Sequence, residues 1–378
     1  MAFLFRKISP LNTKFNLIHG TQVFVISCRK LSIVPSLYDG QDPAPKFFSS
    51  EVETLLRRLT RPDLKKVFRR RTGNQTYKAL PAPIFKFLTT EELEAEMNKT
   101  ERKAAKLLQM PPVVKISEHI DDVLSKDPAL LGYDTAKYYF TDISPGVVKE
   151  RRLIVQRDPD GTLHSCDHDT RKKLDQIYFP INGRKLREPI MFTDNERLHN
   201  LLDREEYEFV LDRACVQYDP DEPSYQRITS VVYQHVDMLS KYQLLRSTRH
   251  FGPLVFYLTW HQTIDNLMLE LLQNNALREA VLLTALKQTI HGNVANPEVA
   301  LDLVPQILAT PVQLKHPEQV SEEDIQLDSK CAECIEKYIK SNSSMKGQQE
   351  LALQGYREYY QQLIELSRGL KKAHGVSA

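Results

Sequence analysis

The stretch that decides the fold is VFYLTWHQTIDNLMLELL, residues 255–272. Its apolar positions recur at intervals of three and four residues, the spacing that lines one face of an α-helix. They are Val255, Leu258, Ile264, Leu267, Met268, Leu271 and Leu272. The uncharged run from His250 to Ile264 within this region is broken by polar residues and is too short to span a bilayer. The stretch therefore predicts packed helices, and we expect Phe256, Tyr257 and Trp260 to fill their core.

The same periodicity extends over residues 194–378, which we predict to be an array of antiparallel helices. Apolar residues repeat in Leu198, Leu201, Leu202 and again in Val231, Val232, Val236, Leu239. Further helices are predicted at 277–290, 297–308, 322–339 and 348–370. No fixed repeat period emerges, so no named repeat family is indicated. The residues beyond Asn275 form either part of the core or a docking arm.

A change of period marks residues 115–193 as a small α+β module. Asp158-Pro-Asp-Gly161 is a strong turn signal between two short strand patterns, which predicts a β-hairpin. The predicted strands are 136–142, 150–156, 161–166 and 187–192, with a helix near 169–178. The fold class is thus α+β and mainly α, with a basic N-terminal helical segment, a small central sheet module and a C-terminal helical array.

Residues 39–114 are predicted to hold a linker followed by basic and capped helices. Residues 51–71 form a helical hairpin or a kinked helix around Pro62. Thr89 and Glu92 have the spacing of a capping box, which opens a helix that we expect to be solvated. Pro111 and Pro112 stop that helix.

The first 38 residues are typical of a mitochondrial presequence. They carry Arg6, Lys7, Lys14, Arg29 and Lys30 among apolar residues, and the first acid is Asp39. A secretory signal is the alternative, because residues 22–27 are apolar. Removal of this segment lowers Lys+Arg from 51 to 46 against 49 Asp+Glu, so the mature chain is near −3. The remaining cysteines are expected to be thiols in the reducing matrix.

Composition excludes several classes of enzyme. The chain has only 13 glycines among 378 residues, and no two are spaced as Gly-x-Gly. The common phosphate-binding loops need closely spaced glycines, so we expect neither a dinucleotide site nor a P-loop. No Ser/His/Asp signature or HExxH motif appears. We predict no enzyme activity, no cofactor, no membrane partner and no small-molecule substrate.

Two clusters resemble metal-ligand motifs. Cys331 and Cys334 form a CxxC pair inside a helical pattern, and His164, Cys166 and His168 lie close together after the hairpin. Zinc would need the two stretches to meet, and nothing in the sequence brings them together. We interpret these residues as core or surface residues and predict no metal site.

The strongest local signal is RRLTRPDLKKVFRRR, residues 57–71, with eight basic residues and one acid. Helical geometry places its apolar residues on one face and its cations on the other, and we expect the cationic face to be solvated. Arginine suits phosphate oxygens, which favours contact with an RNA backbone. Anionic lipid, open solvent or an acidic protein are the alternatives. The candidate RNA-binding residues are Arg57, Arg58, Arg61, Lys65, Lys66, Arg69, Arg70 and Arg71.

A second candidate is LRSTRHFG, residues 245–252, in which Arg246 and Arg249 precede a Gly-Pro helix start. Free backbone N–H groups at a helix start also favour anions. The alternative is that both arginines bridge neighbouring helix termini or acids within the protein.

These residues, in this order, resemble a known family. The runs KYYFTDIS at 137–144, ERRLIV at 150–155 and above all KYQLLRSTRHFG at 241–252 are similar to the small-subunit protein twenty-two family of the animal mitochondrial ribosome. The resemblance spans about residues 50–275. It implies a nuclear-encoded structural component of the mitochondrial small ribosomal subunit, which contacts rRNA and neighbouring ribosomal proteins and supports mitochondrial translation. The rival hypotheses are a matrix RNA-processing or modifying enzyme and a transient small-subunit assembly factor.

Overall fold

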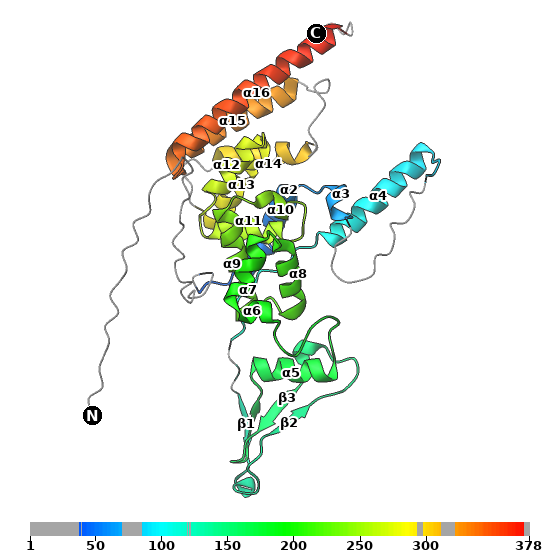
Figure 1. Cartoon of the computed structure of the whole chain (residues 1–378), viewed down its shortest axis with the longest axis vertical. Helices are drawn as coiled ribbons and strands as arrows, with labels where there is room; N and C mark the ends of the chain where they lie inside the picture. Colours follow the sequence, from blue (N-terminus) through cyan, green and yellow to red (C-terminus); the bar gives the residue numbers. More distant parts are fainter. Residues whose placement is uncertain are drawn as a thin grey trace, which may run out of the picture. The chain divides into compact units, whose positions relative to one another are not determined.

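The computed structural model describes Tyr38 and residues 40–69, 85–118, 120, 122–292, 298–310 and 322–373 (Figure 1). Helices dominate these residues and one small four-stranded sheet accompanies them, so the predicted fold class is confirmed. No described helix combines the length and the apolar character needed to cross a membrane. The predicted presequence lies outside the described residues except for Tyr38, as do Arg70 and Arg71.

The predicted break in the basic segment is confirmed. The segment forms α1 (Ala44–Phe47), α2 (Ser50–Thr60) and α3 (Leu64–Val67). Arg61 adopts a left-handed conformation with φ of 49°, and Pro62 follows it, so the chain turns between α2 and α3.

The next helix, α4 (Thr90–Leu107), begins with the predicted capping box. The Thr89 amide donates to Glu92 Oε2 at 2.9 Å, and the Glu92 amide donates to Thr89 Oγ1 at 3.3 Å. Ala104 is the only residue of α4 that is buried. The prediction of a solvated helix is therefore confirmed.

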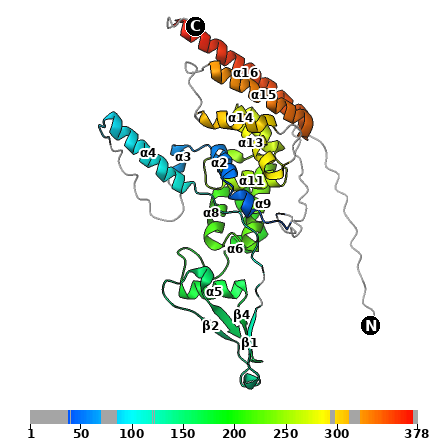
Figure 2. The ribbon, with the colours of Figure 1, turned by 180° about the vertical axis from the view of Figure 1, so that it is seen from behind.

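The sheet is antiparallel, in the order β1-β4-β3-β2 (Figure 2). Its strands are β1 (Val123–Lys126), β2 (Tyr138–Thr141), β3 (Ile154–Arg157) and β4 (Thr162–Ser165). The Asp158–Gly161 turn joins β3 to β4, as predicted, with Gly161 at a φ of 82°. Short 3-10 turns η1 (Pro128–Leu130) and η2 (Lys149–Arg151) and the helix α5 (His168–Tyr178) complete the module.

The strand predicted at residues 187–192 is wrong. Ile190–Thr193 forms the short helix α6, and β1 provides the fourth strand. The helical turn places Phe192 in the core, where none of its surface is exposed. Burial of this ring against the helical array outweighs the local apolar pattern, which cannot distinguish a short strand from a helical turn.

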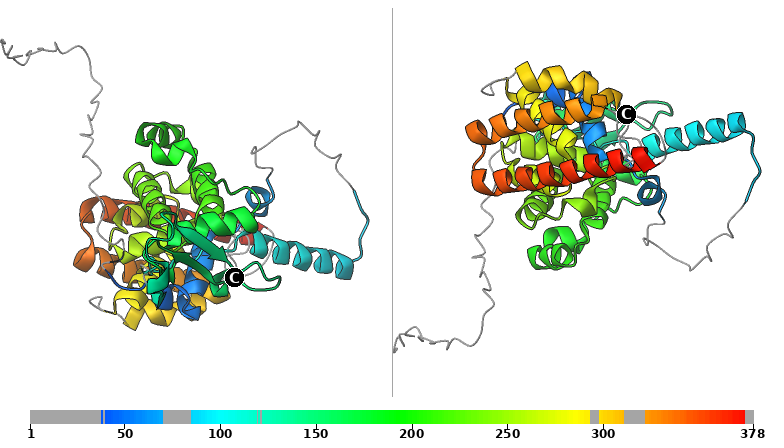
Figure 3. Two further views of the ribbon diagram at one scale, coloured as in Figure 1. Left: turned by 90° about the horizontal axis from the view of Figure 1, so that it is seen from below. Right: turned by 90° about the horizontal axis from the view of Figure 1, so that it is seen from above.

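The remaining helices follow the predicted periodicity closely. They are α7 (Asn195–Asp203), α8 (Tyr207–Gln217), α9 (Pro223–Met238), α10 (Tyr242–Leu245), α11 (Phe251–Trp260), α12 (Asp265–Gln273), α13 (Leu277–His291), α14 (Glu298–Ala309), α15 (Glu322–Asn342) and α16 (Lys346–Ala373). The long helices α15 and α16 pack side by side, and α16 also packs on α12 (Figure 3).

The core centres on α11 and α13. Every residue of α11 is buried, including Phe256, Tyr257 and Trp260, as expected. Helix α13 packs against α2, α11, α12, α14 and α15, so the residues directly after Asn275 belong to the core. Helix α2 inserts its apolar face between α11 and α13. The division into separate domains at residues 39–114, 115–193 and 194–378 stays a prediction.

The hairpin turn offers a test of the sheet module. A Cβ on Gly161 would lie 2.1 Å from the Asp127 carbonyl oxygen, whereas a Cβ on Gly146 would meet no atom of the described residues within 4 Å. Both glycines have positive φ angles, so Gly146→Ala should cost about 1 kcal/mol from backbone strain alone. Gly161→Ala should lower the free energy of unfolding by more, as measured by urea denaturation. Equal losses would contradict the close approach of β4 to η1.

Candidate nucleic-acid interface

The basic helix α2 is amphipathic, and the array uses both of its faces. Val52, Leu55, Leu56 and Leu59 are buried toward α11 and α13. Because these residues fix the rotation of the helix, they also fix where its arginines point. Arg57 is directed to solvent with 72% of its side chain exposed, while Arg61 retains only 24%.

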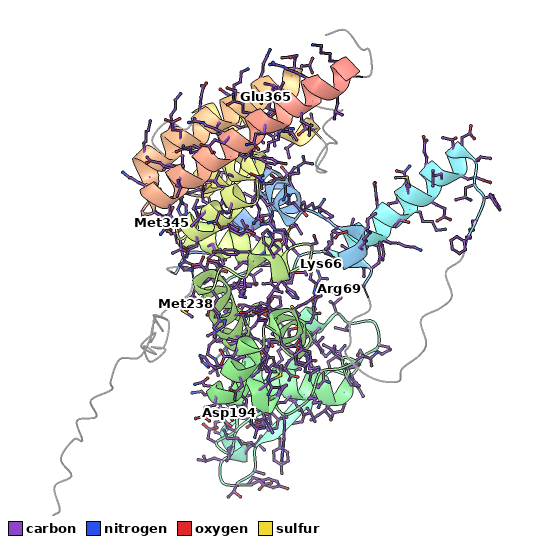
Figure 4. The ribbon with its side chains drawn as sticks, turned by 45° about the horizontal axis from the view of Figure 1, so that its top comes forward. Lys66, Arg69, Asp194, Met238, Met345 and Glu365 are labelled. Atoms are coloured by element: carbon purple, nitrogen blue, oxygen red, sulfur yellow. The ribbon has the colours of Figure 1, made fainter. Side chains whose placement is uncertain are left out.

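The structure brings the two predicted basic stretches together. The amide of Ser247 donates to the Thr60 carbonyl at 3.0 Å, and the Asp63 amide donates to Ser247 Oγ at 3.2 Å. Lys66 Nζ donates to the Gln243 carbonyl at 2.6 Å. Figure 4 labels Lys66, which lies on α3, and Arg69, which follows the end of that helix. The end of α2, the start of α3 and the loop before α11 thus form one structural unit.

Two arginines of α2 are used within the protein. Arg61 Nε lies 2.8 Å from Glu279 Oε1, and Arg58 Nη2 donates to the Thr310 carbonyl at 2.6 Å. Burial lowers the pKa of Arg58, and Glu279 only partly opposes this effect. The expectation of a solvated face is therefore wrong for Arg58 and Arg61. A helix packed in the array cannot leave all of its polar face in water.

The second basic stretch is also neutralised internally. Arg246 is 6% exposed and Glu270 is 7% exposed, and the two side chains form an ion pair with an N–O distance of 2.8 Å. Burial lowers the pKa of Arg246, while Glu270 acts in the opposite direction. Arg249 pairs with Asp212 at 2.8 Å. Both arginines thus bridge to acids of neighbouring helices, which was the alternative interpretation of this stretch.

The cations that remain accessible lie around α3. Lys65 is exposed and has no side-chain partner among the described residues. Lys66 binds only backbone carbonyl oxygens, and burial together with the charges of Arg69 and Arg246 lowers the pKa of Lys66 to about 8. Arg69 forms an ion pair with Glu208 and keeps 37% of its side chain exposed. This surface can offer uncompensated positive charge to an anion.

A second group of cations adjoins α3 and was not among the candidate residues that the sequence indicated. Helix α3 packs on α4, which exposes Arg102, Lys103 and Lys106 on its C-terminal half. Lys99, one turn earlier, pairs with Glu96 at 3.0 Å. We call the following cations the α3–α4 basic surface: the exposed Lys65 and half-buried Lys66 of α3, Arg69 just after α3, and the exposed Arg102, Lys103 and Lys106 of α4. In the sequence, the signal for these cations lies in the runs ERK at 101–103 and AAK at 104–106. Their position beside α3 is evident only from the fold.

The residues that resemble metal ligands are not brought together. His164 Nε2 lies 2.8 Å from Asp158 Oδ2, and His168 Nε2 lies 2.6 Å from the Glu118 carbonyl. Cys331 and Cys334 are buried in α15, where burial raises the pKa of each thiol. Among the described residues, no three histidine, cysteine or acidic side chains cluster as metal ligands.

Comparison with known proteins identifies relatives of this chain. A family model described as mitochondrial 28S ribosomal protein S22 matches residues 45–292. The mouse small ribosomal subunit protein mS22 is 36% identical over 248 residues, which cover 65% of this chain and 67% of the mouse protein. Its bovine counterpart is 34% identical over 247 residues with the same coverage. The matched region begins in α1 and ends just after α13, so it contains α2, the sheet module and the core helices.

Internal and exposed arginines should respond differently to truncation. Arg246→Ala leaves the buried Glu270 without its cation and should cost about 3 kcal/mol of unfolding free energy. Arg57→Ala removes an exposed i,i+4 pair and should change stability by less than about 0.5 kcal/mol. Urea denaturation of both variants measures the contrast, and similar losses would refute the assignment of Arg246 to the interior.

Lys66 should make stability depend on alkaline pH. Its pKa is about 8 in the folded chain against 10.5 for a free lysine side chain. Between these values the unfolded chain holds a proton that the folded chain has released, so unfolding becomes less favourable as pH rises. Relative to Lys66→Met, the wild-type protein should therefore gain stability between pH 8 and 10.5. A stability difference that stays constant over this range would contradict the burial of Lys66.

Proposed function

The chain belongs to the mitochondrial 28S ribosomal protein S22 family, and we therefore propose that it binds rRNA through the α3–α4 basic surface. Its general role follows from the family: it is a structural protein of the mitochondrial small ribosomal subunit. Mitochondrial localisation agrees with the basic, acid-free start of the sequence.

The single observation that carries the RNA proposal is the unequal compensation of positive charge. Arg61, Arg246 and Arg249 form ion pairs with Glu279, Glu270 and Asp212. Among the described residues, no carboxylate lies within 4.0 Å of the charged group of Lys65, Arg102 or Lys103. Phosphate oxygens would supply the missing negative charge. The contact surface we propose therefore omits the N-terminal part of residues 57–71, which lies on α2. It adds the exposed cations of α4. Arg57, at 72% exposure, is a further candidate at its margin.

Neighbouring ribosomal proteins are the second class of partner that we propose. Exposed apolar side chains lie on α4, where Leu93 and Met97 are 49% and 55% exposed, and on β2, where Phe140 is 52% exposed. Exposed apolar patches of this kind mark contact surfaces in proteins that act within assemblies. In this arrangement α4 presents cations and apolar residues at different positions along one solvated helix. It can contact RNA and protein together.

The rival hypothesis of an enzyme would require an activated nucleophile in a cavity, and the cavity beside Cys215 and Tyr225 does not provide one among the described residues. A cavity of about 320 Å³ is lined by Lys106, Cys215, Tyr218, Tyr225 and Arg249 among others. Burial raises the pKa of Cys215 and of Tyr225, which is opposite to the shift that activates a thiol or phenol. These groups are suited to packing, and the structural role is favoured.

Sucrose-gradient sedimentation of mitochondrial lysate tests membership of the particle. The tagged chain should co-migrate with the mature small subunit after a pulse and a long chase of radiolabel. Recovery only in the free matrix pool would refute the proposed function. Loss from the particle during the chase would instead identify a transient assembly factor.

The salt dependence of RNA binding tests the α3–α4 basic surface. Each phosphate contact adds about 0.7 to the log–log salt slope on single-stranded RNA, so the double variant Lys65→Gln/Lys66→Gln should reduce the slope by about 1.4. Lys330→Gln, an exposed lysine on α15 outside the family match, is the control and should leave the slope unchanged. Fluorescence anisotropy at several salt concentrations measures both. An unchanged slope in the double variant would exclude these lysines from the interface.

A further inference from the structure

A second cavity lies inside the sheet module, away from the α3–α4 basic surface. Its volume is about 230 Å³, several times the roughly 30 Å³ that one water occupies in the liquid. Arg152 at the end of η2, Asp175 and Gln176 of α5, and Phe179 and Ile181 of the following loop line its walls. Lys149, Lys172 and Arg184 complete the walls, and these three cations are paired with Asp219 and Glu222. The cavity therefore combines an aromatic ring, an aliphatic side chain, one carboxylate and four cationic groups, of which only Arg152 lacks a close carboxylate partner.

Arg152 enters this cavity with unused hydrogen-bond donors. The residue is 6% exposed, and its Nη2 donates to the Val147 carbonyl at 2.9 Å. Its Nε and Nη1 atoms are buried and have no hydrogen-bond partner among the described residues. The guanidinium carbon lies 3.3 Å from the centre of the Phe179 ring, which holds its plane in place. Buried donors without partners are costly, so such an arrangement calls for an acceptor.

Asp175 adds an unused acceptor beside these donors. It is 6% exposed, and its Oδ2 has no hydrogen-bond partner within the part of the chain that the structure describes. Its Oδ1 lies 4.0 Å from Arg152 Nε, which is too long for a hydrogen bond. Burial raises the pKa of Asp175, although Lys149, Arg171 and Arg152 oppose that shift. Donors and an acceptor thus stand next to each other on the cavity wall without satisfying each other.

This pairing selects the chemistry of an occupant. A small anion would satisfy Arg152 but would be repelled by Asp175, and a cation would meet the reverse problem. A neutral group that carries an acceptor next to a donor satisfies both residues. A flat heterocycle also matches the walls formed by Phe179 and Ile181. Nucleobases have these properties, since arginine binds base acceptors and a carboxylate accepts from a base amino group.

We propose that the cavity binds a single unstacked RNA nucleobase, which presents an acceptor to Arg152 and a donor to Asp175. Proteins commonly recognise RNA in this way, with a base turned out of its stack against aromatic or arginine planes. The inference rests on the proposed function, because it assigns a second, base-reading contact to an rRNA-binding protein.

Ion pairs around the cavity hold it ready for such a ligand. Asp219, in the turn after α8, binds Arg184 at 2.7 Å and also pairs with Lys149. Although burial acts to raise it, these hydrogen bonds lower the pKa of Asp219 to about 2. Lys172 pairs with Glu222 in the same turn. These contacts join η2, α5 and the loop after α5 to the helical array. The cavity walls are therefore already ordered before binding, which lowers the entropy cost of binding a ligand.

Binding to short RNAs with one variable position tests the proposal. The probes are oligouridine eight-mers that carry adenine, cytosine, guanine, uracil or an abasic residue at the fourth position, measured with the full chain by anisotropy. One base should bind at least ten-fold more tightly than the abasic probe. Arg152→Gln should abolish that preference and leave the abasic affinity unchanged. Asp175→Asn removes the charge and replaces one of the two acceptor oxygens with an amide donor, so it should change which base is preferred, a result that loss of packing would not produce.

Matched controls and opposing outcomes separate this proposal from the general function. Arg151→Gln and Asp169→Asn alter exposed neighbours of the same charge and should keep the base preference. Wild-type binding that is equal for all probes would overturn the base pocket while the RNA-binding role stands. No binding to any RNA would refute both. If the pocket variants lose subunit incorporation but keep wild-type RNA binding, the occupant is a protein group and the proposal is wrong.

Discussion

The structure depends on the burial of α2 between α11 and α13. Val52, Leu55, Leu56 and Leu59 supply the apolar contact, and the helix is short, so its rotation is fixed by these four residues. Once that rotation is set, the arginines on the other side must lie at the rim of the array. Desolvation of a guanidinium is unfavourable unless a partner compensates it. Glu279 and the carbonyl of Thr310 are these partners for Arg61 and Arg58.

Because of this constraint, the basic residues 57–71 do not all have the same role. A sequence with eight cations among fifteen residues suggests a continuous polyanion-binding ridge. In the folded chain the first part of the run is structural, because Arg58 and Arg61 tie α2 to α13 and α14. The later part, on α3, faces outward and meets the cations of α4. Positive charge is therefore divided between holding the core together and forming the α3–α4 basic surface.

Ion pairs join the sheet module to the array, in addition to the apolar contact that Phe192 makes with the core. Asp219 receives two cations of the module, and Glu222 receives a third. The same ion pairs surround the cavity that contains Arg152 and Asp175. Strand β2 of this module keeps apolar side chains exposed. Both features suit a protein that must fit among several partners at once.

The sequence by itself determined the features that arise within a few residues. The helices of 194–378 follow from their periodicity, the hairpin from Asp158–Gly161, and the start of α4 from Thr89 and Glu92, because each signal acts within one helical turn or one β-turn. The family resemblance likewise rested on linear runs of residues. Only the tertiary structure decided that 187–192 forms a helical turn, that Arg246 is buried against Glu270, and that α3 lies beside α4. These outcomes depend on groups that are distant in the sequence, such as Arg246 and Glu270, which are 24 residues apart. Their encounter is set by the burial of apolar surface and is not encoded in any local pattern.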